Sequence, residues 1–356
     1  VYKRQGGYWM LMRDFPKTGS LLIHNGTIIT MESELPTAEA LFVRDGKISG
    51  LGSFNEMQKL ADANTATLDL KGKTLLPGFI DSHTHPVLST FTHGMLDLSG
   101  FTHQSNQEVW DHFQAELKQF KPGEWVVCKG LDPVLVEDLE TPQIEFLDEA
   151  APNNPVLIVS QSLHSYWANT LAFAAAGVDA TTPDPSEFSF YEKDDEGQLT
   201  GYFAEQEAFL PFRDVVLAAI GQETLTQYSV DVLDDYAKNG HTAITSLGLT
   251  TADPNIIRLY SHLSSGEPTF ANQMLSQLGF LPARKPMVRH FAFIRFDSLD
   301  LLPESPDNGD DFFKILGVKF WYDGAPYAGT MYLKDPYLDT DFNHDKLHIA
   351  CNHTGA

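Results

Sequence analysis

The pattern of apolar and polar residues near the N-terminus predicts a small layer of short β-strands. Residues 20–32 and 40–52 contain apolar runs of strand length, each with an Asn-Gly or Asp-Gly turn signal. A polar helix is expected over 54–63 and another strand over 66–70. This layer leads directly into an apolar strand over 75–83.

From about residue 86 to 221 the pattern changes to mixed helices and strands. Val109 and Phe113 recur at helical spacing, while the acidic, turn-rich segment 182–198 is typical of an exposed loop. The helix over 142–149 is expected to begin with Thr141 as N-cap and Pro142 at its first position. The elements expected here are helices over 106–120, 142–149 and 169–176 and strands over 125–129 and 155–160.

From residue 223 onward the chain predicts alternating helices and strands. Such alternation is typical of a parallel sheet with helical crossovers, either a doubly wound sheet or a (β/α)₈ barrel. Counting residues 75–83 as the first strand, the chain supplies about five of the eight strands of a barrel. The expected elements are helices over 223–239 and 254–263 and strands over 242–247, 288–294, 314–321 and 346–351.

The strand over 75–83 ends in the most informative motif of the sequence, an Asp-Ser-His-Thr-His run. Side chains of a strand alternate between faces, so His83 and His85 are expected to direct both imidazoles to one point beyond the strand's carboxyl end. Neutral imidazole is the commonest protein metal ligand. Two histidines in a polar turn are the alternative interpretation. The apolar strand in front and the Asp81 carboxylate beside them favour a metal site.

Two further residues stand at the ends of predicted strands. Lys319 lies in the apolar run 314–321, where a lysine would ordinarily be expensive to bury. A buried lysine becomes nucleophilic, and a carbamate formed with carbon dioxide would offer two oxygens to bridge two metal ions. His353 follows the last predicted strand, in the position that His85 holds after the first. A lysine at a strand edge and a histidine in a C-terminal loop are the alternatives.

Composition limits the classes of partner. The 356 residues carry 24 Lys plus Arg against 48 Asp plus Glu, a formal charge of −24, which repels phosphate backbones and anionic lipid. Cys128 and Cys351 are far apart, which excludes a disulfide scaffold and fits a reducing compartment. No apolar run is long enough to span a bilayer, and no signal peptide is evident. A cytoplasmic protein is therefore expected.

The two ends of the sequence do not resemble those of a whole gene product. The chain does not begin with Met, and we expect native sequence to start at or after Met10 or Met12, so that residues 1–19 are a partly non-native tail. The sequence stops directly after an apolar strand pattern at 346–351, where domains rarely end. A C-terminally truncated fragment is the expectation.

Several ordered motifs carry a resemblance to a known family. PGFIDSHTHP after a short β-layer, followed by VKFWYDG and NHTG, resembles the metal-dependent amidohydrolase superfamily. The blocks QSLHSYWANTLAFAAAGV (161–178), Asp184-Pro185 and DEGQLTGYFAEQEA (195–208) resemble amidohydrolase family 3, the branch similar to N-substituted formamide deformylase. The resemblance extends over about residues 20–356. It departs at Ser186-Glu187, where relatives often have a glycine pair.

The resemblance implies an α/β fold, a (β/α)₈ barrel that is incomplete here and is joined to a small N-terminal β-sandwich. The sandwich would include residues 20–74. The barrel would begin with its first strand and the metal motif at 75–90, be interrupted by a large insertion at 91–222, and continue with strands two to five at 223–356. By position, the implied metal ligands are His83, His85, Lys319 and His353. The family's sixth-strand histidine and its general-base aspartate, on the eighth strand, would lie beyond residue 356.

The implied activity is hydrolysis of non-peptide carbon–nitrogen bonds of small amide-type molecules. One or two divalent ions, with Zn²⁺ favoured by the imidazole donors, would bring the pKa of a bound water to about 7. As printed, the chain is expected to be impaired or inactive. A cyclic amidohydrolase, a deaminase, a phosphotriesterase or a non-catalytic binding protein on the same barrel remains an alternative. The aromatic content is compatible with a homo-oligomer.

The family-like block and the segment after it also supply candidates for the substrate pocket. The candidates are His164, Tyr166, Trp167 and Glu205. For the residues of the block, which also contains Asn169, the alternative interpretation is helix capping and packing. For Glu205 the alternative is a surface helix face.

Overall fold

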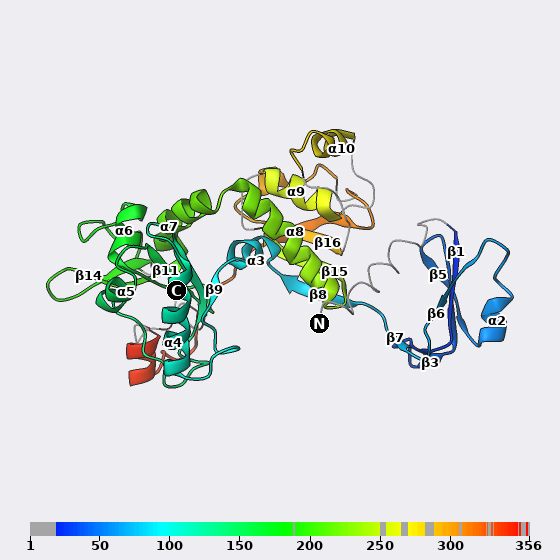
Figure 1. Cartoon of the computed structure of the whole chain (residues 1–356), viewed down its shortest axis with the longest axis horizontal. Helices are drawn as coiled ribbons and strands as arrows, with labels where there is room; N and C mark the ends of the chain where they lie inside the picture. The colour runs from blue at the N-terminus through cyan, green and yellow to red at the C-terminus, as the bar shows by residue number, and fades with distance from the viewer. Residues whose placement is uncertain are drawn as a thin grey trace. The chain divides into compact units, whose positions relative to one another are not determined.

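The computed structural model divides the chain into two compact units, with the division between Phe79 and Ile80 (Figure 1). Each unit is described by itself. All of the expected N-terminal tail except Gly19 lies outside the described residues. The structure describes residues 19–187, 189–249, 254–264, 270–281, 288–305, 308–324, 326, 329, 331–347, 349 and 354.

The described part of the first unit, from residue 19 onward, contains two small sheets and one short helix. In one sheet β1 pairs antiparallel with β4 and parallel with β6, and β5 is the outer neighbour of β4; in the other, β2 lies between β3 and β7. Its elements are β1 (Ser20–His24), β2 (Thr27–Ile29), β3 (Thr37–Ala38), β4 (Ala40–Arg44), β5 (Lys47–Gly52), α2 (Phe54–Gln58), β6 (Ala66–Asp69) and β7 (Thr74–Leu75).

Local signals explain most of this unit. Asn25 and Asp45 adopt left-handed backbone conformations, with φ of 59° and 49°, as the predicted turns require. Ser53 caps α2 in a capping box with Glu56, which confirms the predicted helix. The helix ends at Gln58, five residues before the predicted end.

The second unit contains a six-stranded sheet in the order β13-β14-β12-β11-β10-β9. Neighbouring strands β9, β10 and β11 are parallel, and the pairs β11–β12, β12–β14 and β13–β14 are antiparallel. The strands are β9 (Leu96–Asp97), β10 (Val126–Leu131), β11 (Val156–Ser160), β12 (Ser165–Ala168), β13 (Phe190–Lys193) and β14 (Leu199–Ala204), and the helices are α4 (Asn106–Glu116), η1 (Leu117–Gln119), α5 (Ile144–Ala150), α6 (Thr170–Ala176) and α7 (Glu205–Ile220).

Both faces of this sheet are buried, so its strands are nearly continuous apolar runs. Leu157 and Tyr166 point into one core, while Ile158 and Trp167 point into the other. A bulge in β10 between Lys129 and Leu131 changes the alternation of faces, so that Leu131 joins the same core as Cys128.

The predictions for this region are partly confirmed. The helix from Asn106, the strands β10 and β11, and the helix closed by Gly177 (φ 69°) are all present. The helix predicted from Pro142 begins instead at Ile144, whose backbone packs against Gly201 of β14, so a tertiary contact sets its start. The segment 182–198 is not simply a loop, because β13 lies within it and pairs with β14.

A four-stranded sheet with the order β17-β16-β15-β8 forms the rest of the second unit. Strands β15, β16 and β17 are parallel, which confirms the predicted parallel sheet with crossovers. The strands are β8 (Phe79–Thr84), β15 (His241–Leu249), β16 (Arg289–Arg295) and β17 (Phe313–Lys319), and the helical segments are α3 (Pro86–Thr92), α8 (Gln222–Lys238), α9 (Pro254–Ser264), α10 (Phe270–Gln277), η2 (Leu299–Leu301) and η4 (Phe342–Lys346).

Two strand predictions need correction. The run expected as one strand over 75–83 is two strands, since β7 ends at Leu75 and β8 begins at Phe79; Pro77, which lacks an N–H, lies in the gap. Lys346, the expected start of the last strand, instead ends the η4 turn. Residues 348, 350 and 351 of that predicted strand lie outside the described part of the chain. Within the described part, no helix is long and apolar enough to cross a membrane.

His290, the second residue of β16, is a fully buried histidine in the core of the four-stranded sheet. Its ring meets Tyr260 and Phe313 edge-on, and neither ring nitrogen has a hydrogen-bond partner among the described residues. Burial lowers the pKa of His290 to about 3. The folded protein therefore holds this imidazole neutral down to acidic pH.

We expect His290 to make the protein acid-labile. The unfolded chain takes up a proton at His290 near pH 6.5 and the folded chain only near pH 3, so the free energy of unfolding falls as the pH drops below 6.5. The loss between pH 7.5 and pH 5 is about 2 kcal/mol. In urea denaturation at the two pH values, His290→Phe should remove most of that difference, and His112→Phe should leave it. An equal pH dependence in His290→Phe and the wild type would contradict this role.

Candidate functional site

The two histidines of the predicted metal motif lie together at the end of β8. Their ring centroids are 5.3 Å apart, with the ring planes 70° from parallel. The Asp81 side chain accepts a hydrogen bond from the His83 backbone N–H (3.1 Å), which fixes the end of the strand. Thr84, between them, is buried and donates to the carbonyl of Thr245 in β15 (3.2 Å). This hydrogen bond joins the end of β8 to the neighbouring strand β15.

His85 has left the strand and stands at the N-cap of α3, directly before Pro86. Its Nδ1 is buried without a hydrogen-bond partner in the described ranges. The pKa of His85 lies below its usual value because burial disfavours the imidazolium, and the positive charges of His83 and Lys319 oppose it further. A neutral imidazole with an unpartnered buried nitrogen is the state that a metal ligand requires.

Helix α3 holds His85 in place from both sides. Val87 packs against the core of the four-stranded sheet, while Phe91 and, just beyond the helix, Met95 belong to a core of the six-stranded sheet. The helix follows His85 without a linker. The position of His85 is therefore set by both sheets of the second unit.

Lys319 is the last residue of β17, as the sequence predicts for a lysine near a strand end. Its side chain passes Gly248 of β15, where a Cβ would lie 3.2 Å from the lysine Cγ, and Gly248 has a φ of +84° that favours glycine. The Lys319 Nζ lies 5.6 Å from the centre of the Trp321 ring. The effect of Lys319 on His85 places its charge near the histidine pair.

The fourth predicted metal ligand, His353, lies outside the described residues. No group of three or more His, Cys, Asp or Glu side chains placed to hold a metal occurs in the part of the chain that the structure describes. The predicted ligand set of His83, His85, Lys319 and His353 therefore stays a prediction, of which the structure brings together the pair His83 and His85.

The histidine pair opens into a cavity of about 500 Å³. One side is formed by the end of β8 together with α3 and Tyr236 of α8, and the opposite side by the ends of β9, β10 and β11. A cavity of this volume is typical of small-molecule sites. The residues of the opposite side that bear polar side chains are Asp97, Ser99, Lys129, Ser160 and Gln161.

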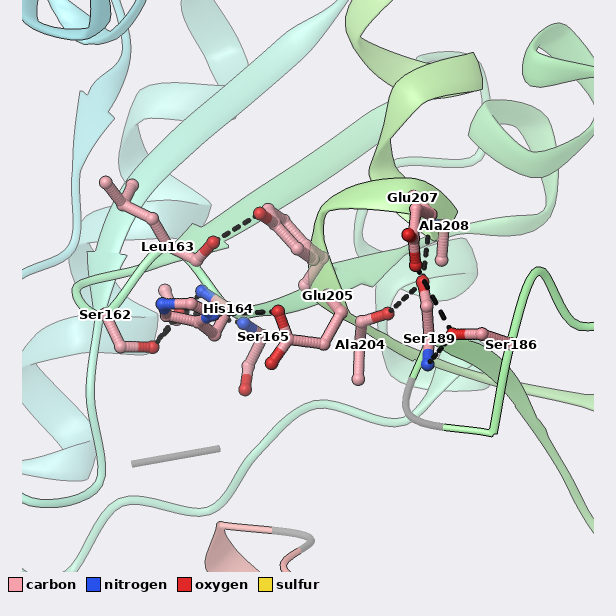
Figure 2. A network of polar contacts seen from close by, with 12 residues as sticks. Ser162, Leu163, His164, Ser165, Ser186, Ser189, Ala204, Glu205, Glu207 and Ala208 are labelled. Carbon is pink, nitrogen blue, oxygen red and sulfur yellow. Dashed lines mark hydrogen bonds and ion pairs between the residues drawn. The ribbon is translucent and has the colours of Figure 1, made fainter. Parts of the chain in front are cut away.

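Two of the four pocket candidates form a close pair at the same edge of the six-stranded sheet (Figure 2). His164 Nδ1 lies 2.9 Å from Glu205 Oε2, and the Glu205 backbone N–H donates to the His164 carbonyl (2.8 Å). Glu205 has a φ of +69° at the first position of α7, and its other carboxylate oxygen is buried without a partner among the described residues. Leu163, with a φ of +66°, lines the cavity. Such backbone strain is concentrated at functional sites.

The other two candidates are packed in the cores. Tyr166 stacks on Phe203 and Phe209 and donates its hydroxyl hydrogen to the Leu163 carbonyl; burial raises its pKa. Trp167 is 2% exposed in the opposite core. Both side chains support the strand that presents His164.

The side of the cavity formed by the ends of β9, β10 and β11 is its far wall. Its polar residues were not identified from the sequence. Lys129 and Asp97 come together only through the pairing of β10 with β9. The available signal was Lys129 at the end of an apolar strand, the same signal that identified Lys319. Asp97, in a strand of two residues, had none.

Comparisons with known proteins agree with the motifs. The model of the amidohydrolase family matches residues 66–354. YtcJ of Bacillus subtilis, provisionally named an amidohydrolase, is 29% identical over 322 residues, which are 89% of this chain and 56% of YtcJ. N-substituted formamide deformylase of Arthrobacter pascens is 32% identical over 190 residues, 53% of this chain and 35% of that enzyme. The chain thus spans about half of the length of YtcJ.

The fold has a counterpart among solved structures. The crystal structure of a protein from Pyrococcus horikoshii, described as an uncharacterized metal-dependent hydrolase, superposes with a TM-score of 0.58 at 21% identity. The match covers 90% of this chain and 58% of the other. At this identity the likeness concerns the fold.

Proposed function

Because the chain belongs to the amidohydrolase family, as its motifs predict, we propose that it forms the metal-binding part of a hydrolase of non-peptide carbon–nitrogen bonds. The observation that carries the proposal is the histidine pair at the end of β8, 5.3 Å apart, with a buried and unpartnered nitrogen on His85. The name of the Arthrobacter relative suggests N-substituted formamides as the substrate class.

The residues fit a divalent cation, which we propose to be zinc. His83 and His85 would hold it, joined by Lys319 as a carbamate and by His353. When bound, the ion acidifies water and polarises a substrate carbonyl. Asp81 and Thr84 hold the end of β8, from which both imidazoles would reach the ion. The low pKa of His85 keeps its ring neutral and available as a ligand at neutral pH.

The barrel is part of the proposal. Four strands in the order β17-β16-β15-β8 fit the first half of a (β/α)₈ barrel, in which active sites lie at the carboxyl ends of the strands. His83 and Lys319 occupy such ends on the two outer strands. Exposed apolar side chains on these strands, such as Ile80 (71%) and Leu316 (51%), fit a sheet that further strands would cover. The sixth-strand histidine and the general-base aspartate would come from those strands.

His164 and Glu205 have a supporting role in this proposal. When His164 is neutral and carries its proton on Nδ1, this nitrogen donates a hydrogen bond to Glu205. The other ring nitrogen, Nε2, is then a hydrogen-bond acceptor. The anionic carboxylate at the start of α7 is favoured by the helix dipole. Together with the strained backbone at Leu163, the pair would position the substrate at the rim of the cavity.

Activity can be tested on the complete gene product that contains this chain. We expect formate release from N-substituted formamides that depends on added zinc and falls at least about 100-fold in His83→Ala, since losing even a group that supports a ligand lowers activity 10- to 100-fold. His24→Ala, a change in the first unit, should leave turnover unchanged. Zinc-independent release, or full activity in His83→Ala, would contradict the proposal.

A further inference from the structure

The far wall of the cavity is built from the carboxyl ends of three parallel strands. Because β9, β10 and β11 run in the same direction, Asp97, Lys129 and Ser160 all lie at one edge of the six-stranded sheet. This edge faces the end of β8 across the cavity of about 500 Å³. These side chains and the histidine pair therefore line one cavity.

The β10 bulge places Lys129 at this edge. Gly130, with a φ of +85°, fills the bulge, and a Cβ there would lie 2.6 Å from the Cβ of Ser99. The Lys129 carbonyl accepts the Leu98 backbone N–H (2.9 Å), which fastens β10 to the strand beside it. Bulges next to active sites redirect side chains. Here the bulge leaves Lys129 half-buried on the wall of the cavity.

The Lys129 ammonium group has no direct partner in the described part of the chain. No hydrogen bond reaches its Nζ there, and no carboxylate lies within 4.0 Å of it. Asp97 is opposite Lys129 in the strand pairing and accepts the Ser99 backbone N–H (2.9 Å). Partial burial raises the pKa of Asp97, but the hydrogen bonds from Ser99 and the charge of Lys129 outweigh it, so the pKa is below its ordinary value. Asp97 is thus a nearby anion that orients the lysine without neutralising it by contact.

We propose that Lys129 binds a carboxylate on the substrate, so that the enzyme acts on amides with an anionic group on an apolar arm. This inference rests on the proposed function. Within the described residues Lys129 is the one cation of the cavity lining, and the apolar arm would pack against Leu88, Phe101 and Leu163. Gln161 also lines the cavity, and its carboxamide oxygen would lie 3.3 Å from a Cβ at Gly130. A monovalent carboxylate suits this wall better than a phosphate, since Asp81 and Asp97 also face the cavity.

The test compares two substrates that differ only in this charge, racemic N-formylphenylalanine and N-formylphenylalaninol. We expect Lys129→Met in the complete, zinc-loaded protein to raise the KM for N-formylphenylalanine about 10- to 100-fold, the effect of losing a charge-assisted hydrogen bond. The KM for the neutral alcohol should change little. Lys121→Met, at a lysine whose side chain is 84% exposed, is the matched control and should change neither.

Binding is measured in parallel by titration calorimetry of N-formylphenylalanine into the zinc-free protein. Wild-type protein that hydrolyses neither compound would contradict the proposed function, and the calorimetric comparison of wild type with Lys129→Met would still decide the role of Lys129. Hydrolysis of both compounds with the same KM ratio in Lys129→Met and wild type would overturn the carboxylate site alone. Thermal melting of each variant shows that the fold is intact.

Discussion

Replacing His85 with alanine is expected to lower the affinity of the chain for zinc at least about 100-fold. His85 supplies one of two neighbouring imidazoles, and loss of a group that merely supports a ligand already costs 10- to 100-fold in affinity. The Nδ1 of His85 is buried and unpartnered in the described structure, so this nitrogen is already desolvated. Zinc binding by competition with a chromophoric chelator at pH 7.5 measures the change.

The pH dependence of zinc binding is a second test of His85 as a ligand. Because the pKa of His85 is below its usual value, protons should compete with zinc at His85 only at a lower pH than at an ordinary histidine. His24→Ala is the control, since His24 contacts Phe54 in the first unit and takes no part in the pair. Equal zinc affinity in His85→Ala and His24→Ala would exclude His85 as a ligand.

Replacing Asn169 with alanine is expected to destabilise the protein by about 2–4 kcal/mol. Asn169 is fully buried, and its Oδ1 accepts the backbone N–H groups of Val156 (2.9 Å) and Ala172 (3.0 Å). Its amide nitrogen donates to the carbonyl of Asn154 (2.9 Å). Loss of an N-cap costs about 0.5–2 kcal/mol and each buried unpaired group about 1–3 kcal/mol. The free energy of unfolding in urea measures the effect.

The neighbouring Thr170 provides the control for this change. Its hydroxyl group bonds to Asp148 at an exposed position (2.6 Å), so Thr170→Ala should cost less than about 1 kcal/mol. Asn169→Asp keeps the acceptor oxygen and loses the donor, and should fall between the two. A stable Asn169→Ala protein with impaired substrate binding would instead show that Asn169 belongs to the pocket.

The capping of α6 shows which features the sequence reveals. Asn169 before an apolar helix and Gly177 after it are local signals, and the structure uses both. The parallel sheet was predicted for a similar reason, since alternating periodicities report on the elements themselves. The histidine pair followed from spacing along one strand. Each of these inferences needs only residues that are close in sequence.

The features that the sequence did not reveal depend on contacts between distant segments. Strand β12 has four residues, two of them aromatic, and is recognisable only when it is paired between β11 and β14. The left-handed conformation of Glu205 is imposed by the packing around it, because no residue type signals it there. Likewise, Lys129 and Asp97 are 32 positions apart and meet by strand register alone.

Zinc K-edge X-ray absorption of the chain loaded with one equivalent of zinc tests the metal centre most directly. We expect nitrogen or oxygen ligands at about 2.0–2.1 Å with outer-shell scattering from at least two imidazoles. In each of the variants His83→Ala and His85→Ala, the scattering contribution of one imidazole should be lost. A zinc ion without imidazole ligands, or imidazole scattering that both substitutions leave unchanged, would contradict this expectation.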